Sequence, residues 1–452
     1  MMGLATRSLR HRPTGAIATF VTVLLGTALM ASFATLVESA LRAADEDREL
    51  LILMGAVVGG WAALIVAFSA ASTVGIVAEQ RSAEASLLRA VGATPRQARA
   101  LIVGEALVLA LVAAGAGALV ASAGGPALFA ALRRGGLITP ASSYAGGPAS
   151  LAVAAGVVVL VSLLAAAGSS GRATRGPAAL ARRAAQASSW RMPRWRLIVG
   201  AVLVAGGVAS AIVTLTVTGK ADNAYPAMQT SGSASIVVGV GLAALAPVLA
   251  RRLLAPARPL LLRLDDGTPG RFAGVGQLVA HDITRRPQLL AGMLAPVIVL
   301  VSTAVGTMLM VGIDSRTLAA AGDPEQVGGT ITMLNSVIIG MVSLFAAIMV
   351  VNATVAVVKH RRAELTRLWR LGATAGQLRA TVVLEAALVS AVGILLGLLG
   401  STATAVPYAI VRHEGMVPDG QLWVPPLVAA VAVALAVGTA GAAAGVRQRS
   451  ER

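Results

Sequence analysis

Apolar runs of about 20 residues recur along the chain and restrict its fold more than any other feature. A helix of that length crosses the hydrocarbon core of a bilayer, where every backbone polar group must be bonded within the protein. The residues are 56% hydrophobic and only 13% charged. We therefore predict an all-α, polytopic transmembrane helical bundle of about ten helices. The expected spans are residues 16–37, 51–76, 100–122, 150–169, 197–218, 234–250, 288–312, 330–357, 380–406 and 424–446.

The charges indicate how these spans cross the membrane. If both termini are cytoplasmic, most of the 37 Lys and Arg residues fall in inner segments, as the positive-inside rule requires. The net charge of +17 is thus explained by topology, and no nucleic-acid partner is expected. Residues 7–12 followed by an apolar run resemble a signal peptide, but the run is longer than such a segment needs, so we expect an uncleaved first span. The preference for Arg over Lys and the abundance of Ala and Gly suggest a bacterial genome, so we expect the spans to lie in the plasma membrane of a bacterium.

One stretch of sequence occurs twice. Residues 79–105 read EQRSAEASLLRAVGATPRQARALIVGE, and residues 359–385 read KHRRAELTRLWRLGATAGQLRATVVLE. The two copies align without a gap, which chance does not explain. The identities are Arg81, Glu84, Leu88, Gly92, Ala93, Thr94, Gln97, Arg99 and Glu105 in the first copy and Arg361, Glu364, Leu368, Gly372, Ala373, Thr374, Gln377, Arg379 and Glu385 in the second.

Each copy predicts a polar elbow at the foot of a membrane helix. A charged helix is expected to end at Gly92 or Gly372, because glycine tolerates the left-handed conformation that follows a helix C-terminus. Thr94 or Thr374 then begins the next helix as an N-cap, and the Gln three residues later completes a capping box. The second helix soon becomes wholly apolar and enters the membrane.

The repetition extends beyond the elbows. A short basic segment ends at Pro13 before the first span and at Pro287 before the seventh. Each is followed by the same order of spans, elbow and loops, so we predict two parallel four-helix repeats with a helix pair inserted between them. The predicted division is 1–185 for the first repeat, 186–262 for the central pair and 263–452 for the second repeat.

Small residues four apart recur within the spans, at Ala113 and Gly117, Gly393 and Gly397, and Gly55 and Gly59. This spacing lets two helix backbones approach closely in lipid. The sequence leaves open whether these contacts lie inside one molecule or at a mobile interface.

The elbows resemble the signature of the FtsX-like permease family, which are membrane subunits of ABC transport systems. The resemblance covers both four-span repeats. It implies that each elbow is a coupling helix on which a separate ABC-type ATPase, expected as a dimer, docks. The residues expected to couple to it are Arg81, Glu84, Leu87, Leu88, Arg89, Val91, Gly92, Ala93, Thr94, Arg361, Glu364, Leu365, Leu368, Leu371, Gly372, Ala373 and Thr374. Trp369 replaces the family's usual Arg in the second copy.

The chain has no motif for an ATP site or for catalysis. The one Gly-Lys pair, at Gly219, lacks the rest of a P-loop, so ATP and Mg²⁺ are expected to bind the partner. The four His residues are scattered, and no cofactor or metal site is expected. The intramembrane acids Glu105 and Glu385 lie near helix N-termini, close in sequence to Arg99 and Arg379. A structural or coupling role and a proton or substrate role both stay open for them.

The predicted outer loops are too short to hold the large extracytoplasmic domain that such permeases usually carry. The favoured function is therefore ATP-driven export or extraction of a hydrophobic or amphipathic substrate, such as a lipid, a lipoprotein or an antimicrobial compound, with membrane lipids as further partners. One alternative is a non-transporting signalling subunit that couples ATPase state to a cell-wall hydrolase or a sensor kinase. Another is a secondary transporter, which would need paired intramembrane charges.

Overall fold

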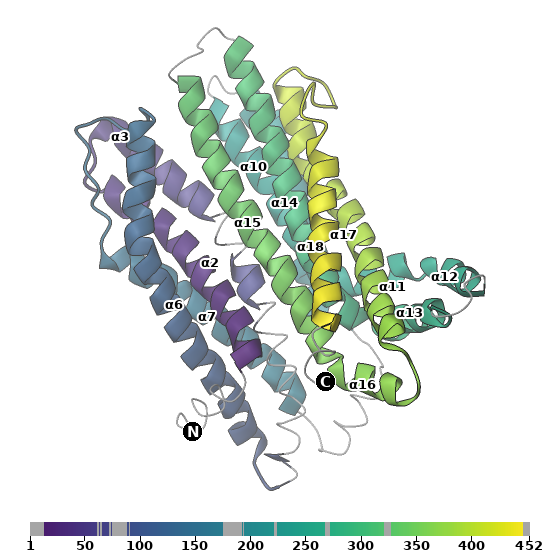
Figure 1. The fold of residues 1–452 in the computed structure, drawn as a ribbon. Coiled ribbons are helices and arrows are strands. Elements are labelled where there is room, and N and C mark those ends of the chain that lie inside the picture. Colours follow the sequence, from purple (N-terminus) through teal and green to yellow (C-terminus); the bar gives the residue numbers. More distant parts are fainter. Residues whose placement is uncertain are drawn as a thin grey trace. The chain divides into compact units, whose positions relative to one another are not determined.

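The computed structural model describes residues 13–60, 63, 66–71, 74, 88–89, 91–174, 192, 194–220, 224–266, 272–320 and 327–445. All regular secondary structure in these residues is helical, which confirms the predicted all-α class (Figure 1). The chain forms two compact units. The first comprises Met1–Ala187 and Val311–Phe345, and the second comprises Ser188–Met310 and Ala346–Arg452.

The first unit is built around α2, which packs against both α6 and α7. A core of Phe33, Leu36, Leu128 and Phe129 is buried where α2 meets the end of α6. Its described elements are α2 (Pro13–Ala40), α3 (Asp45–Leu53), the π-helix η1 (Met54–Val58), α6 (Pro95–Arg134) and α7 (Pro148–Thr174).

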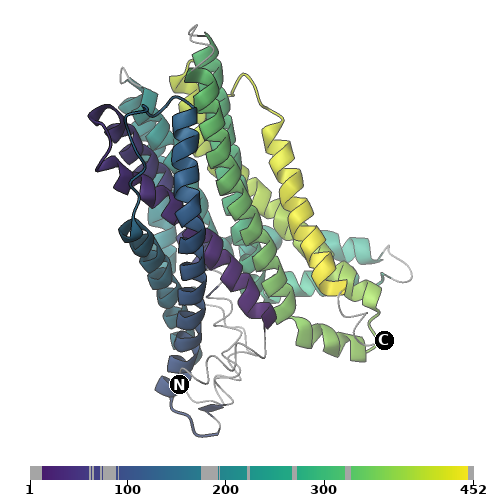
Figure 2. The same ribbon diagram turned by 60° about the vertical axis from the view of Figure 1, so that its left-hand side comes forward.

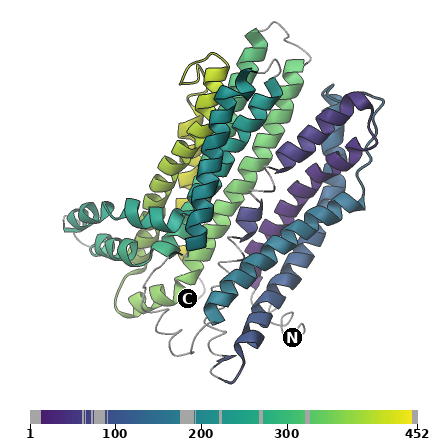
Figure 3. The same ribbon diagram turned by 180° about the vertical axis from the view of Figure 1, so that it is seen from behind.

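The second unit holds the remaining described helices, and α14 and α15 contribute residues to both units. In it, α9 packs on α10, α10 also packs on α17, and α18 lies beside α17 (Figures 2 and 3). The elements are α9 (Arg194–Thr216), the short η2 (Thr218–Lys220), α10 (Ala224–Ala244), α11 (Ala246–Leu254), α12 (Ala257–Asp266), α13 (Val275–Arg285), α14 (Pro287–Ala320), α15 (Val327–His360), α16 (Arg362–Arg370), α17 (Ala375–Val411) and α18 (Val424–Gly445).

Eight helices in the described residues are long and apolar enough to cross a membrane. They correspond to the first, third to seventh, ninth and tenth predicted spans, which confirms a polytopic bundle. The predicted span 51–76 falls largely outside the described residues. The predicted span 330–357 coincides with the backbone of α15, whose side chains are described only in places.

The predicted sixth span, 234–250, is placed wrongly. The membrane-length helix runs from Pro226 to Ala244, and Pro247 lies in the first turn of a separate helix, α11. Proline is disfavoured inside a helix but suits its first turn. The membrane-length helix therefore ends before Leu245, and α11 begins after it. The span starts before the predicted residue 234 because the hydroxyls in its first turns are satisfied within the helix. Thr230 Oγ1, for example, donates to the Pro226 oxygen at 3.0 Å.

The small-residue motifs are sites of close helix packing within each unit. A β-carbon added at Gly117 of α6 would lie 2.8 Å from the Thr27 β-carbon of α2. One added at Gly397 of α17 would lie 2.6 Å from the Val301 β-carbon of α14. Thr27 and Val301 occupy the same position when the prolines that begin α2 and α14 are aligned. Each unit thus contains the same contact between equivalent helices.

A buried carboxylate joins the α6–α7 loop of the first unit to the start of α3. Asp47, in the first turn of α3, accepts hydrogen bonds from Thr139 N at 3.1 Å, Thr139 Oγ1 at 2.6 Å and Ser142 Oγ at 2.6 Å. Burial raises the pKa of Asp47, but these hydrogen bonds to the charged form outweigh it and hold the pKa below its ordinary value. The α6–α7 loop is therefore fixed to the start of α3.

We expect Asp47→Asn to destabilise the protein by about 2 kcal/mol at pH 7, because the amide replaces a charged acceptor. A lowered folded-state pKa gives stability that is complete above the unfolded-state value and is lost as the pH falls through the folded-state value. The difference in thermal unfolding between wild type and variant, measured in detergent, should therefore shrink as the pH is lowered from 7 towards 3. Glu46→Gln, an exposed acid in the same helical turn, is the control. Equal shifts for the two variants would contradict the prediction.

Candidate functional site

The second elbow lies at one end of its unit, between α16 and α17 (Figure 1). Gly372 follows α16 with φ of 103°, a left-handed conformation. The Gly372 N–H bonds to the Trp369 oxygen at 3.0 Å, and the Ala373 N–H bonds to the Leu368 oxygen at 3.1 Å. These two bonds form a Schellman motif, which satisfies carbonyls that a helix end leaves unbonded. We call this end of either unit the elbow end.

The described residues of the first elbow have the same geometry. Gly92 has φ of 109°, its N–H bonds to the Arg89 oxygen at 3.1 Å, and the Ala93 N–H bonds to the Leu88 oxygen at 3.0 Å. The left-handed glycine predicted after each helix is confirmed in both copies. Three predicted coupling residues, Arg81, Glu84 and Leu87, lie outside the described residues.

Both predicted capping boxes are present. Thr94 Oγ1 accepts from Gln97 N at 3.3 Å, and the Thr94 N–H donates to Gln97 Oε1 at 2.9 Å. The corresponding distances for Thr374 and Gln377 are 3.2 and 2.8 Å. Each membrane helix therefore begins at a fixed residue, and the direction of the chain at the corner is set by local bonds.

Each elbow exposes an apolar side chain just before its glycine. Val91 is 90% exposed and Leu371, at the equivalent position, is 84% exposed. Leu88 and Trp369 are also exposed, whereas Leu365 and Leu368 are half-buried against the unit. Val91 and Leu371 therefore contribute little to the core of their own unit.

A buried cluster of charges lies beneath the second elbow. Arg361, only 4% exposed, forms ion pairs with Glu385 of α17 and with Asp282 of α13, the latter at 2.5 Å. Arg361 also pairs with Glu364, with 3.6 Å between Nε and Oε2. Glu364 in turn pairs with Arg286. The cluster joins α13, the start of α16 and α17.

The electrostatics of the cluster keep Arg361 charged. Burial lowers its pKa, but attraction by Glu385, Asp282 and Glu364 outweighs burial and holds the pKa above its ordinary value. A buried guanidinium of this kind is stabilised only while its carboxylates remain in place. Arg361 therefore stabilises the elbow from inside the protein, and its side chain is not part of the exposed face of the elbow.

The sequence did not indicate the ion-pair partner of Glu385. The nearby Arg379 is exposed, and the ion pair of Glu385 is with Arg361. In the first unit Glu105 is likewise buried, while Arg99 donates to the Ala167 oxygen at 3.2 Å. Glu105 and Glu385 thus share burial at equivalent positions, and a role in proton or substrate movement stays a prediction.

Asp282 and Arg286 were missed in the sequence. They lie in the basic segment before Pro287, where Asp282 is the one acid of HDITRRP. Aligning that segment with the one before Pro13 places Ser8 opposite Asp282. The sequence did contain one signal for this site. It is an acidic residue within a basic segment, which occurs in one repeat and not in the other.

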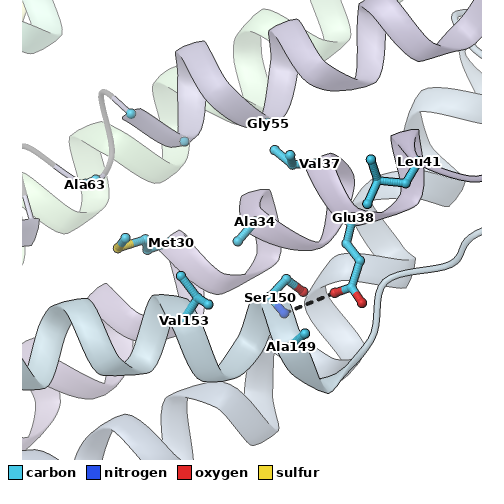
Figure 4. A pocket seen from close by; sticks show the side chains of 12 residues that line it. Met30, Ala34, Val37, Glu38, Leu41, Gly55, Ala63, Ala149, Ser150 and Val153 are labelled. Atoms are coloured by element: carbon cyan, nitrogen blue, oxygen red, sulfur yellow. Dashed lines mark hydrogen bonds between the residues drawn. The ribbon is translucent and has the colours of Figure 1, made fainter.

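The first unit also contains a cavity of about 520 Å³ beside α2 (Figure 4). Apart from Glu38 and Ser150, which lie together at one end, its walls are apolar or glycine residues of three segments. The Glu38 carboxylate accepts from Ser150 N of α7 at 3.0 Å. The lining residues are Met30, Ala34, Val37, Glu38, Leu41, Gly55, Gly59, Gly60, Ala63, Ala149, Ser150 and Val153.

The comparison with known families agrees with this architecture. The family model described as FtsX-like permease C-terminal matches residues 56–178 and 336–451, which together make up more than half of the chain and include both elbows. The chain belongs to the FtsX-like permease family. This FtsX-like protein is therefore a multi-pass membrane subunit of the ABC-transporter permease type, a non-catalytic kind of subunit that generally partners with an ABC ATPase. A comparison with curated proteins found no match.

We expect Arg361→Met to destabilise the FtsX-like protein by about 3–5 kcal/mol, because it leaves two buried carboxylates without their cation. Thermal unfolding in detergent measures the loss. Adding Asp282→Asn and Glu385→Gln to the same variant should recover some of it. The exposed neighbour Arg362 supplies the control, Arg362→Met, for which we expect a change within about 0.5 kcal/mol. If the two methionine variants unfold at the same temperature, the cluster is not a stabilising element.

Proposed function

We propose that the chain is the permease of an ATP-driven exporter and that both elbows dock on a separate ABC-type ATPase. The observation that carries this proposal is the identical corner in both units, each presenting an exposed apolar side chain at Val91 or Leu371. A helix that only rested on lipid headgroups would not need the same Schellman motif and capping box twice. Two such elbows in one chain suit an ATPase dimer.

The second elbow is built to pass a movement on to the membrane helices. Arg361, at the start of α16, is paired to Glu385 inside α17, so the elbow helix and the span are joined by a buried ion pair as well as by the chain. A displacement of α16 by the ATPase would therefore move α17. ATP and Mg²⁺ act in the partner, and this chain contributes the coupling surface.

The elbow end is proposed to face the cytoplasm of a bacterial cell, with both termini on that side. The basic residues of the sequence concentrate in the segments that join the spans at that end, as the positive-inside rule predicts. An ATPase that uses cytoplasmic ATP would meet the elbows there.

The substrate is proposed to be hydrophobic or amphipathic. The cavity beside α2 has apolar walls and a carboxylate at one end, which suits a molecule with an apolar chain and a polar head. In the first unit only residues 41–44 separate α2 from α3, so this connection holds no folded domain. This favours transport over the alternative of signalling through a large outer domain.

The docking proposal predicts that an ATPase co-purifies with the tagged wild-type chain in mild detergent. Its activity should be lost when the chain carries both Gly92→Val and Gly372→Val. A β-branched residue is strongly disfavoured at φ above 100°, at a cost of at least about 1–2 kcal/mol per site. A β-carbon at either glycine meets no atom within 4 Å, so the effect comes from the backbone rather than from a clash.

Two controls accompany this pair of substitutions. Gly92→Asn with Gly372→Asn should retain more of the activity than the valine pair, because Asn adopts positive φ more readily than a β-branched residue does. Gly104→Ala replaces a helical glycine that also has open space around it and should have no effect. No ATPase activity with the wild-type chain, or equal activity in all variants with normal membrane insertion, would refute docking at the elbows.

The substrate proposal predicts that Ala34→Phe, which fills the cavity, weakens binding of a lysophospholipid with a fluorescent acyl chain. A loss of at least about tenfold is expected, measured as the dissociation constant in detergent. Val112→Phe places the same ring on an exposed face of α6 outside the cavity and should leave binding unchanged. An unchanged constant for Ala34→Phe would show that the cavity does not hold the amphiphile.

A further inference from the structure

The second unit carries a helical arm made of α11, α12 and α13. It leaves the bundle directly after the span that ends at Ala244 and returns at Pro287, where α14 begins. Figures 1 and 3 show the arm projecting sideways at the elbow end of the unit. Since both of its ends are joined to ends of membrane-length helices, the arm lies at the level of the membrane surface.

The arm is held together by its own core. Leu254, Leu261 and Val279 are buried, and α13 packs against both α12 and α11. Asp265 Oδ1 accepts the Gly276 N–H at 2.9 Å, and a β-carbon at Gly276 would lie only 2.5 Å from the Leu261 oxygen. The arm is thus a folded hairpin with a defined outer surface.

That outer surface is basic. Among the side chains that the structure describes between residues 246 and 286, every exposed Asp, Glu, Lys or Arg is an Arg, while Asp265 and Asp282 are buried. The exposed Arg residues are Arg251, Arg252, Arg258, Arg263, Arg285 and Arg286. The described surface of the arm therefore has a single sign of charge.

Large apolar side chains lie among these Arg residues. Leu260 is 58% exposed, and Leu253 and Phe272 are also exposed. Leu260 and Arg263 are three residues apart in α12, so they share one side of the helix. Exposed Leu and Phe beside Arg are typical of helices that lie in the interface of an anionic membrane.

We propose that this arm binds anionic phospholipid headgroups of the leaflet on the elbow side, with Leu253 and Leu260 at the acyl boundary. The charge of the arm complements phosphate, and its position between two membrane spans places it against lipid. Lipid binding by the arm requires neither transport nor the ATPase.

The arm also contacts the second elbow. Asp282 of α13 pairs with Arg361, and Gln377, the capping-box residue of α17, donates from Nε2 to the Ala273 oxygen at 3.0 Å. A lipid bound to the arm would therefore be linked through two contacts to the corner between α16 and α17.

A fluorescent probe on the arm tests the proposal in the full chain. The sequence contains no Cys, so Leu260→Cys gives a single labelling site. In vesicles containing phosphatidylglycerol we expect the probe to be quenched by a nitroxide on a lipid headgroup. In uncharged detergent, titration with phosphatidylglycerol should give a saturable change in its emission.

The second variant adds Arg252→Gln, Arg258→Gln and Arg263→Gln to the labelled chain. Each Arg near an anionic surface contributes about fivefold, so the concentration for half-maximal response should rise on the order of 100-fold. The matched control removes three exposed Arg residues of the elbow, as Arg362→Gln, Arg367→Gln and Arg370→Gln, and should respond like the parent.

Absence of headgroup quenching, or an equal response in the parent and the arm variant, would overturn the proposal. So would a probe that responds only when an ATPase is added, since the arm would then be a protein-docking surface. No ATP is present in the lipid assay, and no residue of the arm lines the cavity beside α2, so failure of the assay would leave the proposed export function untouched.

Discussion

A buried guanidinium between two carboxylates is the interaction on which the second elbow depends. Arg361 connects α13, α16 and α17, three elements that the chain alone would leave free to separate. Breaking one pair would leave a charge in an apolar interior, which costs far more than breaking a surface ion pair. The elbow, the arm and the foot of α17 therefore behave as one piece.

The two repeats share their backbone design but differ in chemistry. The close contact at Gly117 recurs at Gly397, and both corners have the same left-handed glycine. Yet Ser8 aligns with Asp282, so the third member of the buried cluster has no acidic counterpart in the first repeat. Trp369 in place of Arg89 adds a second difference at the exposed tip. One chain thus presents two related but unequal elbows.

Local features of the site could be predicted from the sequence, and long-range ones could not. The corner at Gly372 and the cap at Thr374 depend on neighbours a few residues away, so their residue types were sufficient. The pairing of Arg361 with Asp282 joins helices far apart in sequence, and no pattern of hydropathy encodes it. The sixth span was misplaced because its hydroxyls, satisfied by their own helix, resemble a polar loop in sequence, and because Pro247 begins a new helix.

The length of α6 and α17 has a mechanical consequence. Each runs as one helix from its capping box to the far end of its unit, over 40 and 37 residues, with its one internal proline, Pro126 or Pro407, near its C-terminal end. At 1.5 Å per residue, α6 is about 60 Å long, twice the thickness of the hydrocarbon core. A tilt of about 5° at the elbow would carry the opposite end through about 5 Å, half the diameter of a helix. A rigid helix of this length would act as a lever: a small push at one membrane surface would become a displacement at the other that is large enough to separate neighbouring helices.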